Sequence, residues 1–354
     1  GSLTALFFYN CLDKKTLLSI LIWVFLRGFP SGILMIDKAK KILKEYWGYD
    51  KFRPFQERAI LSAMSRRDSI VVLPTGGGKS LCFQVPAVAM DGLTVVISPL
   101  ISLMKDQVDS LRQCGINAVR IDSSITDAER EYAYNAIEDG SVKLVYVSPE
   151  RMMQQGFIDY LKSKNLSMAA IDEAHCISMW GHDFRPEYRQ IGALKEMLPG
   201  VSIHAFTATA TKQVQRDIHK QLNLDNPEIL VGSFDRPNLI YRVEPAGDTV
   251  KQVCEVVERF KNQSGIVYCI RRKDVEEMHS ALSVKGYKSL PYHAGMSDML
   301  RKFNQDAFIR EKVDIIVATV AFGMGIDKSN VRFVIHTGMP KSIEHYQQES
   351  GRAG

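Results

Sequence analysis

Short apolar runs rich in β-branched residues alternate with longer amphipathic segments along most of the chain. This alternation is typical of parallel strands that helices cover on both faces. In the first part of the chain, strands are expected at Ser69 to Leu73, Thr94 to Ser98, Ala118 to Ile121, Lys143 to Val147, Met168 to Asp172 and Ile203 to Thr207. Helical periods such as Leu100 to Gln113 and Lys212 to Leu222 separate these strands, so the pattern predicts an α/β fold.

The alternation stops at the turn-rich stretch Gly232 to Asn238 and then begins again. Further strands are expected at Gly265 to Ile270, Lys288 to Tyr292, Asp314 to Thr319 and Arg332 to His336. A length of 354 residues suits two domains rather than one core. We therefore predict a first domain at 37–231, a linker at 232–239 and a second domain at 240–354.

Residues 1–36 differ from the rest of the chain. Their apolar run, Leu17 to Leu26, is too short for a membrane span and is followed by Pro30. A signal peptide is the alternative, because Lys14 and Lys15 precede the run, but no convincing small-residue cleavage site follows. We expect this leader to be extraneous or disordered, with a native start at Met35. The chain is then expected in the cytoplasm or nucleoid, neither secreted nor in a membrane.

Composition narrows the class of protein only a little. With 45% hydrophobic and 24% charged residues, the chain is expected to fold and to be soluble. A net charge of +5 permits a nucleic-acid partner without requiring one. The six cysteines form no C-x-x-C pair, and no histidine stands at ligand spacing, so neither a zinc site nor a disulfide framework is expected.

The strongest motif is LPTGGGKS, which follows the first expected strand. Three consecutive glycines allow a tight turn whose N–H groups surround an anion. Lys79 would then hold the outer phosphates, and the Ser80 hydroxyl would complete the shell of a Mg²⁺ ion. The alternative, a Gly-rich turn with a chance lysine, explains less of the pattern. The predicted phosphate loop comprises Thr75, Gly76, Gly77, Gly78, Lys79 and Ser80.

A second motif, Asp172-Glu-Ala-His175, stands at the end of another expected strand. Two adjacent carboxylates can divide the work there: Asp172 would hold Mg²⁺ and Glu173 would activate the attacking water. We expect this strand end to lie beside the strand that feeds the phosphate loop. The alternative is a pair of solvated acids, and a histidine such as His175 is more often a structural hydrogen-bonding group.

GGGKS followed by DEAH resembles the superfamily 2 helicases, and the whole set of motifs resembles the RecQ family of DNA helicases. His175 stands where the RNA-unwinding DEAD-box proteins have aspartate. The resemblance implies two RecA-like α/β domains, each with a mostly parallel sheet flanked by helices. It rests on WGYDKFRPFQ (47–56), SPLISLMKDQV (98–108), YVSPER (146–151), DEAHCISMWGHDFRPEYR (172–189), FTATAT (206–211), VYCIRRKDVEEM (267–278), ATVAFGMGIDK (318–328) and HYQQESGRAG (345–354).

The resemblance also implies roles for individual residues. Gln56 would read the adenine edge while Tyr49 and Arg53 sandwich the ring, which suits an amide and a guanidinium; this stretch also reads as a helix start. The segment after DEAH would stack unpaired bases and couple DNA binding to hydrolysis, although Trp180 could instead fill a surface hollow. Its predicted DNA-binding residues are Trp180, His182, Phe184, Arg185 and Tyr188, and the coupling residues are His175, Thr207 and Thr209.

In the second domain, Asp327 would reach the ribose, while Gln348 and Arg352 would line the far side of the ATP cleft. The family motif continues with a second arginine after Gly354, so either arginine could neutralise the γ-phosphate.

The motifs and the resemblance together predict the motor core of a RecQ-like helicase that is truncated in its last motif; the 3′-to-5′ direction and the preference for DNA are implied by the resemblance alone. It would be an ATP hydrolase that uses ATP and Mg²⁺, acts as a monomer on single-stranded and partly duplex DNA, and serves DNA repair and recombination. The alternative is an ATP- and nucleic-acid-binding fragment without turnover. A small-molecule kinase is disfavoured, because it would not need the second domain.

Overall fold

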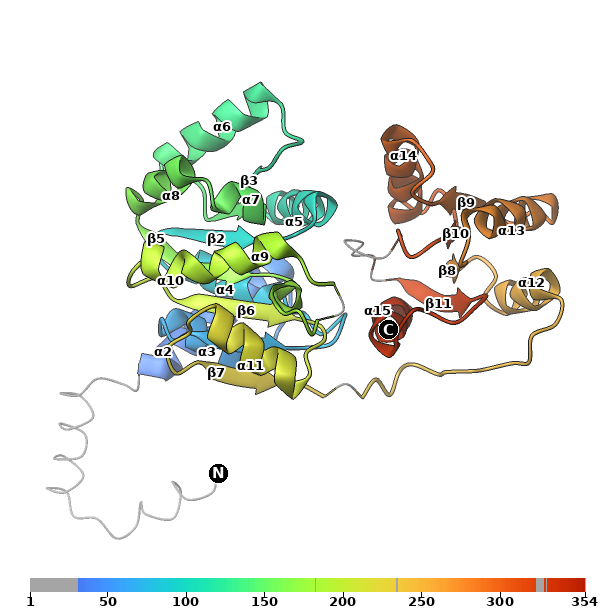
Figure 1. The fold of residues 1–354 in the computed structure, drawn as a ribbon, viewed down its shortest axis with the longest axis horizontal. Coiled ribbons are helices and arrows are strands. Elements are labelled where there is room, and N and C mark those ends of the chain that lie inside the picture. The colour runs from blue at the N-terminus through green and yellow to red at the C-terminus, as the bar shows by residue number, and fades with distance from the viewer. Residues whose placement is uncertain (1–30, 182, 234, 323–327, 329, 354) are drawn as a thin grey trace, which may run out of the picture.

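A computed structural model describes residues 31–181, 183–233, 235–322, 328 and 330–353. It consists of two α/β lobes, and an extended connecting segment between Val231 and Thr249 joins them (Figure 1). Both lobes are built on parallel sheets with flanking helices, so the predicted fold class is confirmed. The boundaries proposed at residues 231 and 239 stay predictions.

The first lobe contains a seven-stranded parallel sheet in the order β3-β4-β2-β5-β6-β1-β7. Successive residues of one strand enter different cores, because Ile70 packs on one face of the sheet and Val71 on the other. The strands are β1 (Ser69–Val72), β2 (Leu93–Ile97), β3 (Ala118–Ile121), β4 (Leu144–Val147), β5 (Leu166–Ile171), β6 (Ile203–Thr207) and β7 (Glu228–Val231). All but β7 were predicted. Ile229 and Val231 in β7 are exposed, as at a sheet edge, and the run is short.

One prediction about this sheet was wrong. The end of β5 does not lie beside β1, because β6 is inserted between the two strands. Ile171 of β5 pairs with Ala205 of β6, and Thr207 of β6 pairs with Val72 of β1. β6 is the next strand in the chain after β5, and consecutive strands commonly pair as neighbours. The two motifs of the first lobe therefore face each other across the end of β6.

Helices cover both faces of the first sheet (Figure 1). They are α2 (Ser31–Trp47), α3 (Gln56–Met64), α4 (Leu81–Ala89), α5 (Ile101–Gln113), α6 (Asp127–Glu138), α7 (Pro149–Met152), α8 (Gln155–Lys162), α9 (Pro186–Gln190), α10 (Leu194–Met197) and α11 (Lys212–Gln221). The predicted leader needs a correction, because residues 31–36 form the start of α2 and Ile36 packs against the core around α2, α3 and α4. Residues 1–30 lie outside the described part.

The second lobe contains a smaller parallel sheet in the order β11-β8-β10-β9. Its elements are α12 (Thr249–Arg259), β8 (Ser264–Tyr268), α13 (Arg272–Val284), β9 (Ser289–Tyr292), α14 (Asp298–Ile309), β10 (Ile315–Ala318), β11 (Val331–His336), α15 (Ile343–Ser350) and the 3₁₀ turn η3 (Gly351–Ala353). In Figure 1, α15 lies on the side that faces the first lobe. Within the described ranges, no helix combines the length and apolarity needed to cross a bilayer.

Candidate functional site

The glycine-rich loop leaves β1 and turns sharply before α4. Gly76 and Gly78 both have φ of 75°, a left-handed backbone that glycine adopts without steric cost. Gly77 N donates to Pro74 O at 2.9 Å and closes the turn. A Cβ atom at Gly78 would lie 2.4 Å from Gln56 Nε2, so a side chain at this position would collide with its neighbour. The glycines are therefore required by the conformation of this loop.

Side chains from outside the loop hold its carbonyl groups. Gln56 accepts from Arg53 N at 2.7 Å through Oε1 and donates to Gly78 O at 3.0 Å through Nε2. The guanidinium of Arg53 donates to Gly76 O. Gln56 is 2% exposed, whereas Tyr49 is 57% exposed. Two of the three predicted adenine-site residues thus touch the loop itself, and their contact with a base stays a prediction.

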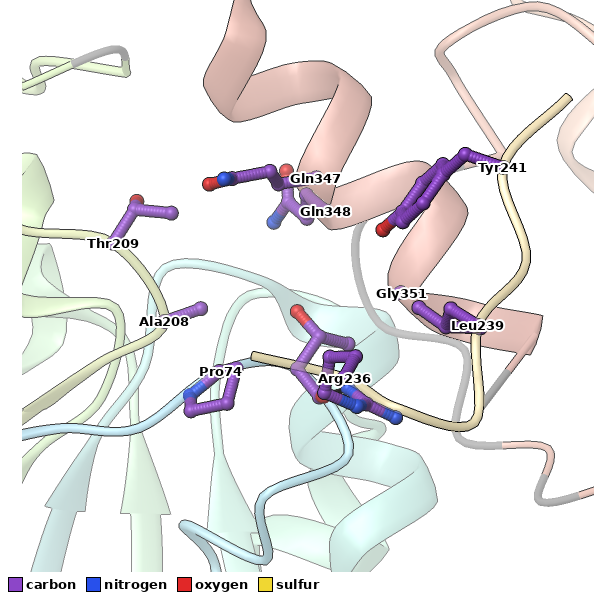
Figure 2. A pocket seen from close by; sticks show the side chains of 10 residues that line it. Pro74, Ala208, Thr209, Arg236, Leu239, Tyr241, Gln347, Gln348 and Gly351 are labelled. Carbon is purple, nitrogen blue, oxygen red and sulfur yellow. Dashed lines mark hydrogen bonds between the residues drawn. The ribbon is translucent and has the colours of Figure 1, made fainter. Parts of the chain in front are cut away.

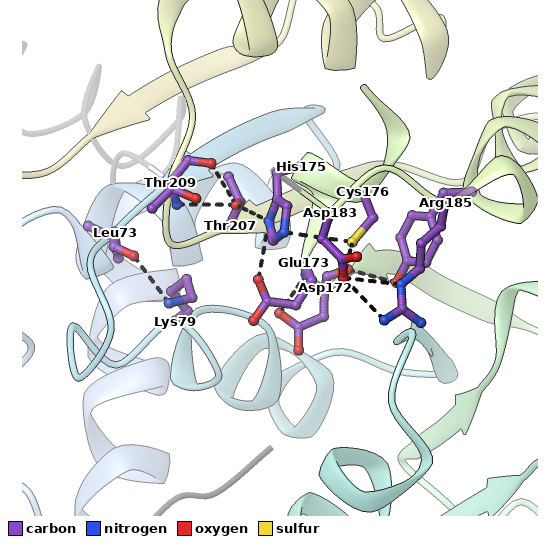
Figure 3. Close-up of polar contacts among 11 residues, drawn as sticks. Leu73, Lys79, Asp172, Glu173, His175, Cys176, Asp183, Arg185, Thr207 and Thr209 are labelled. Atoms are coloured by element: carbon purple, nitrogen blue, oxygen red, sulfur yellow. Dashed lines mark hydrogen bonds and ion pairs between the residues drawn. The ribbon is translucent and has the colours of Figure 1, made fainter. Parts of the chain in front are cut away.

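The two polar residues at the end of the loop have separate partners. Lys79 Nζ donates to Leu73 O at 3.2 Å (Figure 3). Ser80 Oγ accepts from Gln107 Nε2 of α5 at 3.1 Å. The contact between Lys79 and Leu73 involves a single neutral carbonyl, so a phosphate oxygen could replace it at little cost.

The acidic motif follows β5 directly. Asp172 N donates to Ile97 O at 2.8 Å, and Asp172 Oδ1 accepts from Glu173 N at 2.9 Å. Glu173 has φ of 47°, a left-handed backbone unusual for a residue with a side chain. Burial raises the pKa of Asp172, the charge of Glu173 raises it further, and the charge of Lys79 opposes the shift. Lys79 and Glu173 lie close enough to Asp172 for their charges to change its pKa, so the three residues belong to one site.

The donor set of this site fits a magnesium ion. Ser80 and Asp172 offer a hydroxyl and a carboxylate, the oxygen ligands that Mg²⁺ prefers. Among the residues that the structure describes, none donates a hydrogen bond to the buried Glu173 Oε2 atom. A buried carboxylate oxygen without a partner, close to a second buried carboxylate, is costly unless a cation or a proton donor is near.

A buried hydrogen-bond network joins the acidic motif to β6 (Figure 3). Thr207 Oγ1 donates to Thr209 O at 3.0 Å, so it accepts from His175 Nδ1 at 2.9 Å. His175 Nδ1 also lies 3.3 Å from Glu173 Oε2. Burial lowers the pKa of His175 to about 4, so the ring is neutral at pH 7. The structure therefore brings together the three predicted coupling residues, although coupling itself stays a prediction.

Beyond Ser178 the chain reaches the surface. Met179 and Trp180 are exposed, Trp180 to 69%. The Phe184 ring is half-buried, and the Arg189 guanidinium carbon lies 5.7 Å from its centre. His182, a predicted DNA contact, lies outside the described residues.

Two predicted DNA contacts are tied to the protein. Arg185 donates to Asp183 Oδ2 at 3.1 Å and to Pro99 O at 3.1 Å. Tyr188 is completely buried, and its hydroxyl donates to Asp172 O at 3.0 Å. A base cannot stack on a ring in that position, so Tyr188 is reassigned from DNA contact to support of the acidic motif.

A pocket between the lobes brings together residues that are distant in sequence (Figure 2). Its lining includes the phosphate loop, the segment after β6, the connecting segment and α15. Arg236 of the connecting segment donates to Thr75 O. The pocket is lined by Pro74, Thr75, Ala208, Thr209, Arg236, Leu239, Tyr241, Gln347, Gln348 and Gly351.

The last motif contributes differently through its two predicted residues. Gln348 lines the pocket that the phosphate loop also lines. Arg352 lies in η3, close to Tyr268. Burial raises the pKa of Tyr268 to about 12, and the positive charge of Arg352 opposes this rise. Asp327 lies outside the described residues.

Arg236 and Gln107 are polar residues of the site that were not predicted. Arg236 stands in a stretch that reads only as turns, so no periodic signal marks it. Gln107 could have been found, because it lies on the face of α5 whose Met104, Val108 and Leu111 are buried. A polar residue on such a face needs a polar partner.

Comparison with known proteins gives a consistent result. Residues 53–217 match the family of DEAD/DEAH box helicases, and residues 248–354 match the helicase conserved C-terminal domain. The chain is 49% identical over 324 residues to the ATP-dependent DNA helicase RecQ of Haemophilus influenzae, which covers 92% of this chain and 52% of the relative. The corresponding Bacillus subtilis protein is 44% identical, with 90% and 54% covered. The chain spans about half the length of these curated relatives.

Solved structures agree on the fold. A DUF1998 helicase MrfA bound to DNA and AMPPNP has a TM-score of 0.70 at 18% identity, covering 90% of this chain and 48% of that one. The DEAD-box helicase Mss116 bound to ssRNA and UDP-BeF has a TM-score of 0.68 at 18% identity, covering 89% and 70%. At this identity the likeness concerns the two-lobed architecture alone.

Proposed function

The chain belongs to the superfamily 2 helicases, with RecQ proteins among its homologues, and from this premise we propose that it is the ATP-driven motor of a DNA helicase. It hydrolyses ATP between the lobes and uses the closure of the cleft to move along single-stranded DNA in the 3′-to-5′ direction. It acts as a monomer on single-stranded and partly duplex DNA, in the cytoplasm or nucleoid, in repair and recombination.

The observation that carries this proposal is the convergence of three features on one place. The phosphate loop, the two acids after β5 and the segment after β6 lie at one end of the first sheet. The pocket between the lobes is lined by Gln348 of the second lobe together with Thr75 and Thr209 of the first lobe. A site that both lobes line can couple ATP hydrolysis to movement of one lobe against the other.

The residues around the phosphates have separable tasks. Ser80 and Asp172 would hold Mg²⁺, which would supply positive charge at the phosphate oxygens. Lys79 exchanges its contact with Leu73 O for the outer phosphates. The backbone N–H groups of Thr75 to Gly78 surround the phosphates, for which Gly77 N gives up its bond to Pro74 O, and Arg352 neutralises charge at the γ-phosphate. Tyr49, Arg53 and Gln56 hold the adenine, and Asp327 holds the ribose.

Glu173 orients the attacking water and takes its proton. Its buried Oε2 atom accepts no hydrogen bond within the described part of the chain, so it is available as an acceptor. His175 lies 3.3 Å away as a neutral ring, so it orients this carboxylate without supplying a charge.

DNA binding changes this site through the buried network. Trp180 and Phe184 stack on unpaired bases, and His182 and Arg185 contact the strand beside them. The segment that contains these residues continues directly from His175, which bonds to Thr207. Thr207 in turn bonds to Thr209, which lines the interlobe pocket.

The test is ATP hydrolysis measured with and without single-stranded DNA. The parent chain is expected to turn over ATP faster with DNA. The Lys79→Ala variant is expected to lose about 100-fold or more, because one preorganised charge at the phosphates is removed. Lys285→Ala, at an exposed position of the second lobe, is the control and should match the parent. Nucleotide binding without hydrolysis in the parent would favour a binding fragment over a motor.

A further inference from the structure

Helix α5 carries one polar residue on its inner face. Met104, Val108 and Leu111 of this face are buried, and Gln107 lies between them on the same side of the helix. A side-chain amide in such surroundings needs hydrogen-bond partners, because an unpaired polar group near the core is costly.

Two buried side chains fix the orientation of the Gln107 amide. Its Oε1 atom accepts from Tyr146 Oη at 2.9 Å and from Gln84 Nε2 at 3.2 Å. Gln84 Nε2 also lies 3.2 Å from Tyr146 Oη, so the three groups form one cluster. Burial raises the pKa of Tyr146, which keeps its hydroxyl protonated and able to donate. With both donors facing Oε1, the amide nitrogen must point away from them.

The amide nitrogen points toward the phosphate loop. Gln107 Nε2 donates to Ser80 Oγ at 3.1 Å. This bond occupies one lone pair of the serine oxygen and limits the rotation of the hydroxyl. The remaining lone pair and the hydrogen of Ser80 then have restricted directions, which prepares the hydroxyl to act as a ligand.

We propose that Gln107 is a positioning residue for the Ser80 hydroxyl, with Gln84 and Tyr146 as its supports. The inference rests on the proposed function, in which Ser80 is a magnesium ligand. Gln107 does not touch the nucleotide. It holds the Ser80 hydroxyl in the direction that the Mg²⁺ ion requires. A neutral hydroxyl needs such support because it attracts the ion only weakly.

The test is the magnesium dependence of nucleotide binding. Binding of a fluorescent ATP analogue is followed at increasing Mg²⁺ concentration, so the readout does not depend on hydrolysis. Gln107→Met keeps the length of the side chain and removes the donor. It is expected to raise the half-saturating Mg²⁺ concentration about tenfold, as loss of a group that supports a metal ligand typically does. Gln113→Met, at an exposed position of the same helix, should match the parent.

A double-substitution cycle separates positioning from general structure. In a Ser80→Ala background, Gln107→Met should have no further effect on the magnesium dependence, because the group it positions is absent. An equal loss in both backgrounds would overturn the proposal. If Ser80→Ala alone raises the magnesium requirement and Gln107→Met does not, only this inference fails. If Ser80→Ala has no effect, the ligand assignment in the proposed function fails as well.

Folding of each variant is checked by thermal unfolding. Should Gln107→Met fail to fold, Tyr146→Phe decides the question, because it removes one donor to Gln107 Oε1 and preserves the ring. A smaller rise in the magnesium requirement is expected for Tyr146→Phe. An unchanged requirement in a folded Tyr146→Phe variant would then contradict the proposal.

Discussion

The stretch from Asp172 to Arg189 has a buried half, residues 172–178 together with Tyr188, and an exposed half around Met179 and Trp180, and the two differ sharply in their surroundings. In the first half, Asp172 is 6% exposed and His175 is 3% exposed, and their polar atoms bond within the protein. In the second half, Met179 and Trp180 present apolar surface to solvent. Burial in the core explains the positions of the side chains in the first half. Burial does not explain the second half, where large apolar side chains are exposed next to each other. Such exposed groups usually mark a binding surface.

Chemistry and recognition are thus divided between the buried and the exposed half. The buried half has a fixed geometry, which hydrolysis needs, and the exposed half keeps side chains free for a partner. We therefore expect substitutions in the first half to change turnover or stability, and substitutions in the second half to change the response to DNA.

The largest effect is expected for Glu173→Gln. The amide keeps the size of the side chain but cannot accept the proton of the attacking water, so hydrolysis should fall about 10²- to 10⁴-fold. Binding of the ATP analogue should stay close to that of the parent. Glu131→Gln, at an exposed position of α6, is the control. Loss of nucleotide binding together with turnover would show that Glu173 is a structural or binding group.

The pH dependence of stability tests the buried half without ATP. The pKa of His175 is about 4 in the folded chain, against 6.5 for an ordinary histidine. Below pH 6.5 the unfolded chain gains a proton that the folded chain does not, so stability falls as the pH drops toward 4. The loss attributable to His175 is about 2 to 3 kcal/mol over this window.

Urea unfolding of the parent and of His175→Gln at several pH values measures this contribution. The raised pKa of Asp172 acts in the opposite direction, because the folded chain then binds a proton more readily than the unfolded chain. The Asp172 contribution is present in both proteins, so the difference between them isolates His175. His219→Gln, on the exposed side of α11, should keep the slope of the parent. Equal slopes for parent and His175→Gln would show that the ring is charged or exposed.

Trp180→Ala is expected to have a selective effect of intermediate size. Stacking on an unpaired base contributes about 1 to 3 kcal/mol, so affinity for single-stranded DNA should fall roughly tenfold. ATP hydrolysis without DNA and the melting temperature should stay unchanged, because the ring is exposed. Tyr132→Ala removes another exposed aromatic side chain and should leave DNA affinity unchanged. A parallel fall in stability and in both activities would assign Trp180 to the core instead.

The smallest effect is expected for Tyr188→Phe, which tests where the buried half ends. The substitution removes one buried hydrogen bond to Asp172 O, at a cost of about 1 kcal/mol in the free energy of unfolding. DNA affinity should not change, since the ring is inaccessible. A loss of DNA affinity without a loss of stability would restore Tyr188 to the exposed half.

Local patterns predicted the elements of the fold better than their arrangement. The strands of the first sheet were visible as apolar runs because both faces of that sheet are buried. The position of β6 between β5 and β1 was not visible, because strand order depends on pairings between distant segments. The exposed edge strand β7 was missed because half of its side chains face solvent.

The same limit applies to the site. Lys79, Asp172 and Glu173 could be identified from their residue types, because a lysine or a pair of acids at the end of a strand is distinctive. Residue types do not give the direction of a side chain. Tyr188, which faces the core, was therefore grouped with the exposed Trp180. Arg236 gave no signal at all, since its contact with Thr75 joins two segments that are distant in the sequence.

The left-handed backbone at Glu173 has a consequence for engineering this chain. Glycine adopts this conformation at less cost than a side-chain residue, by about 1 kcal/mol. A library screened only for resistance to heat would therefore favour Glu173→Gly, which removes the group that takes the proton from water. Selection for robustness and selection for turnover oppose each other at this position, so a thermal screen of this protein should sequence codon 173 among its survivors before measuring anything else.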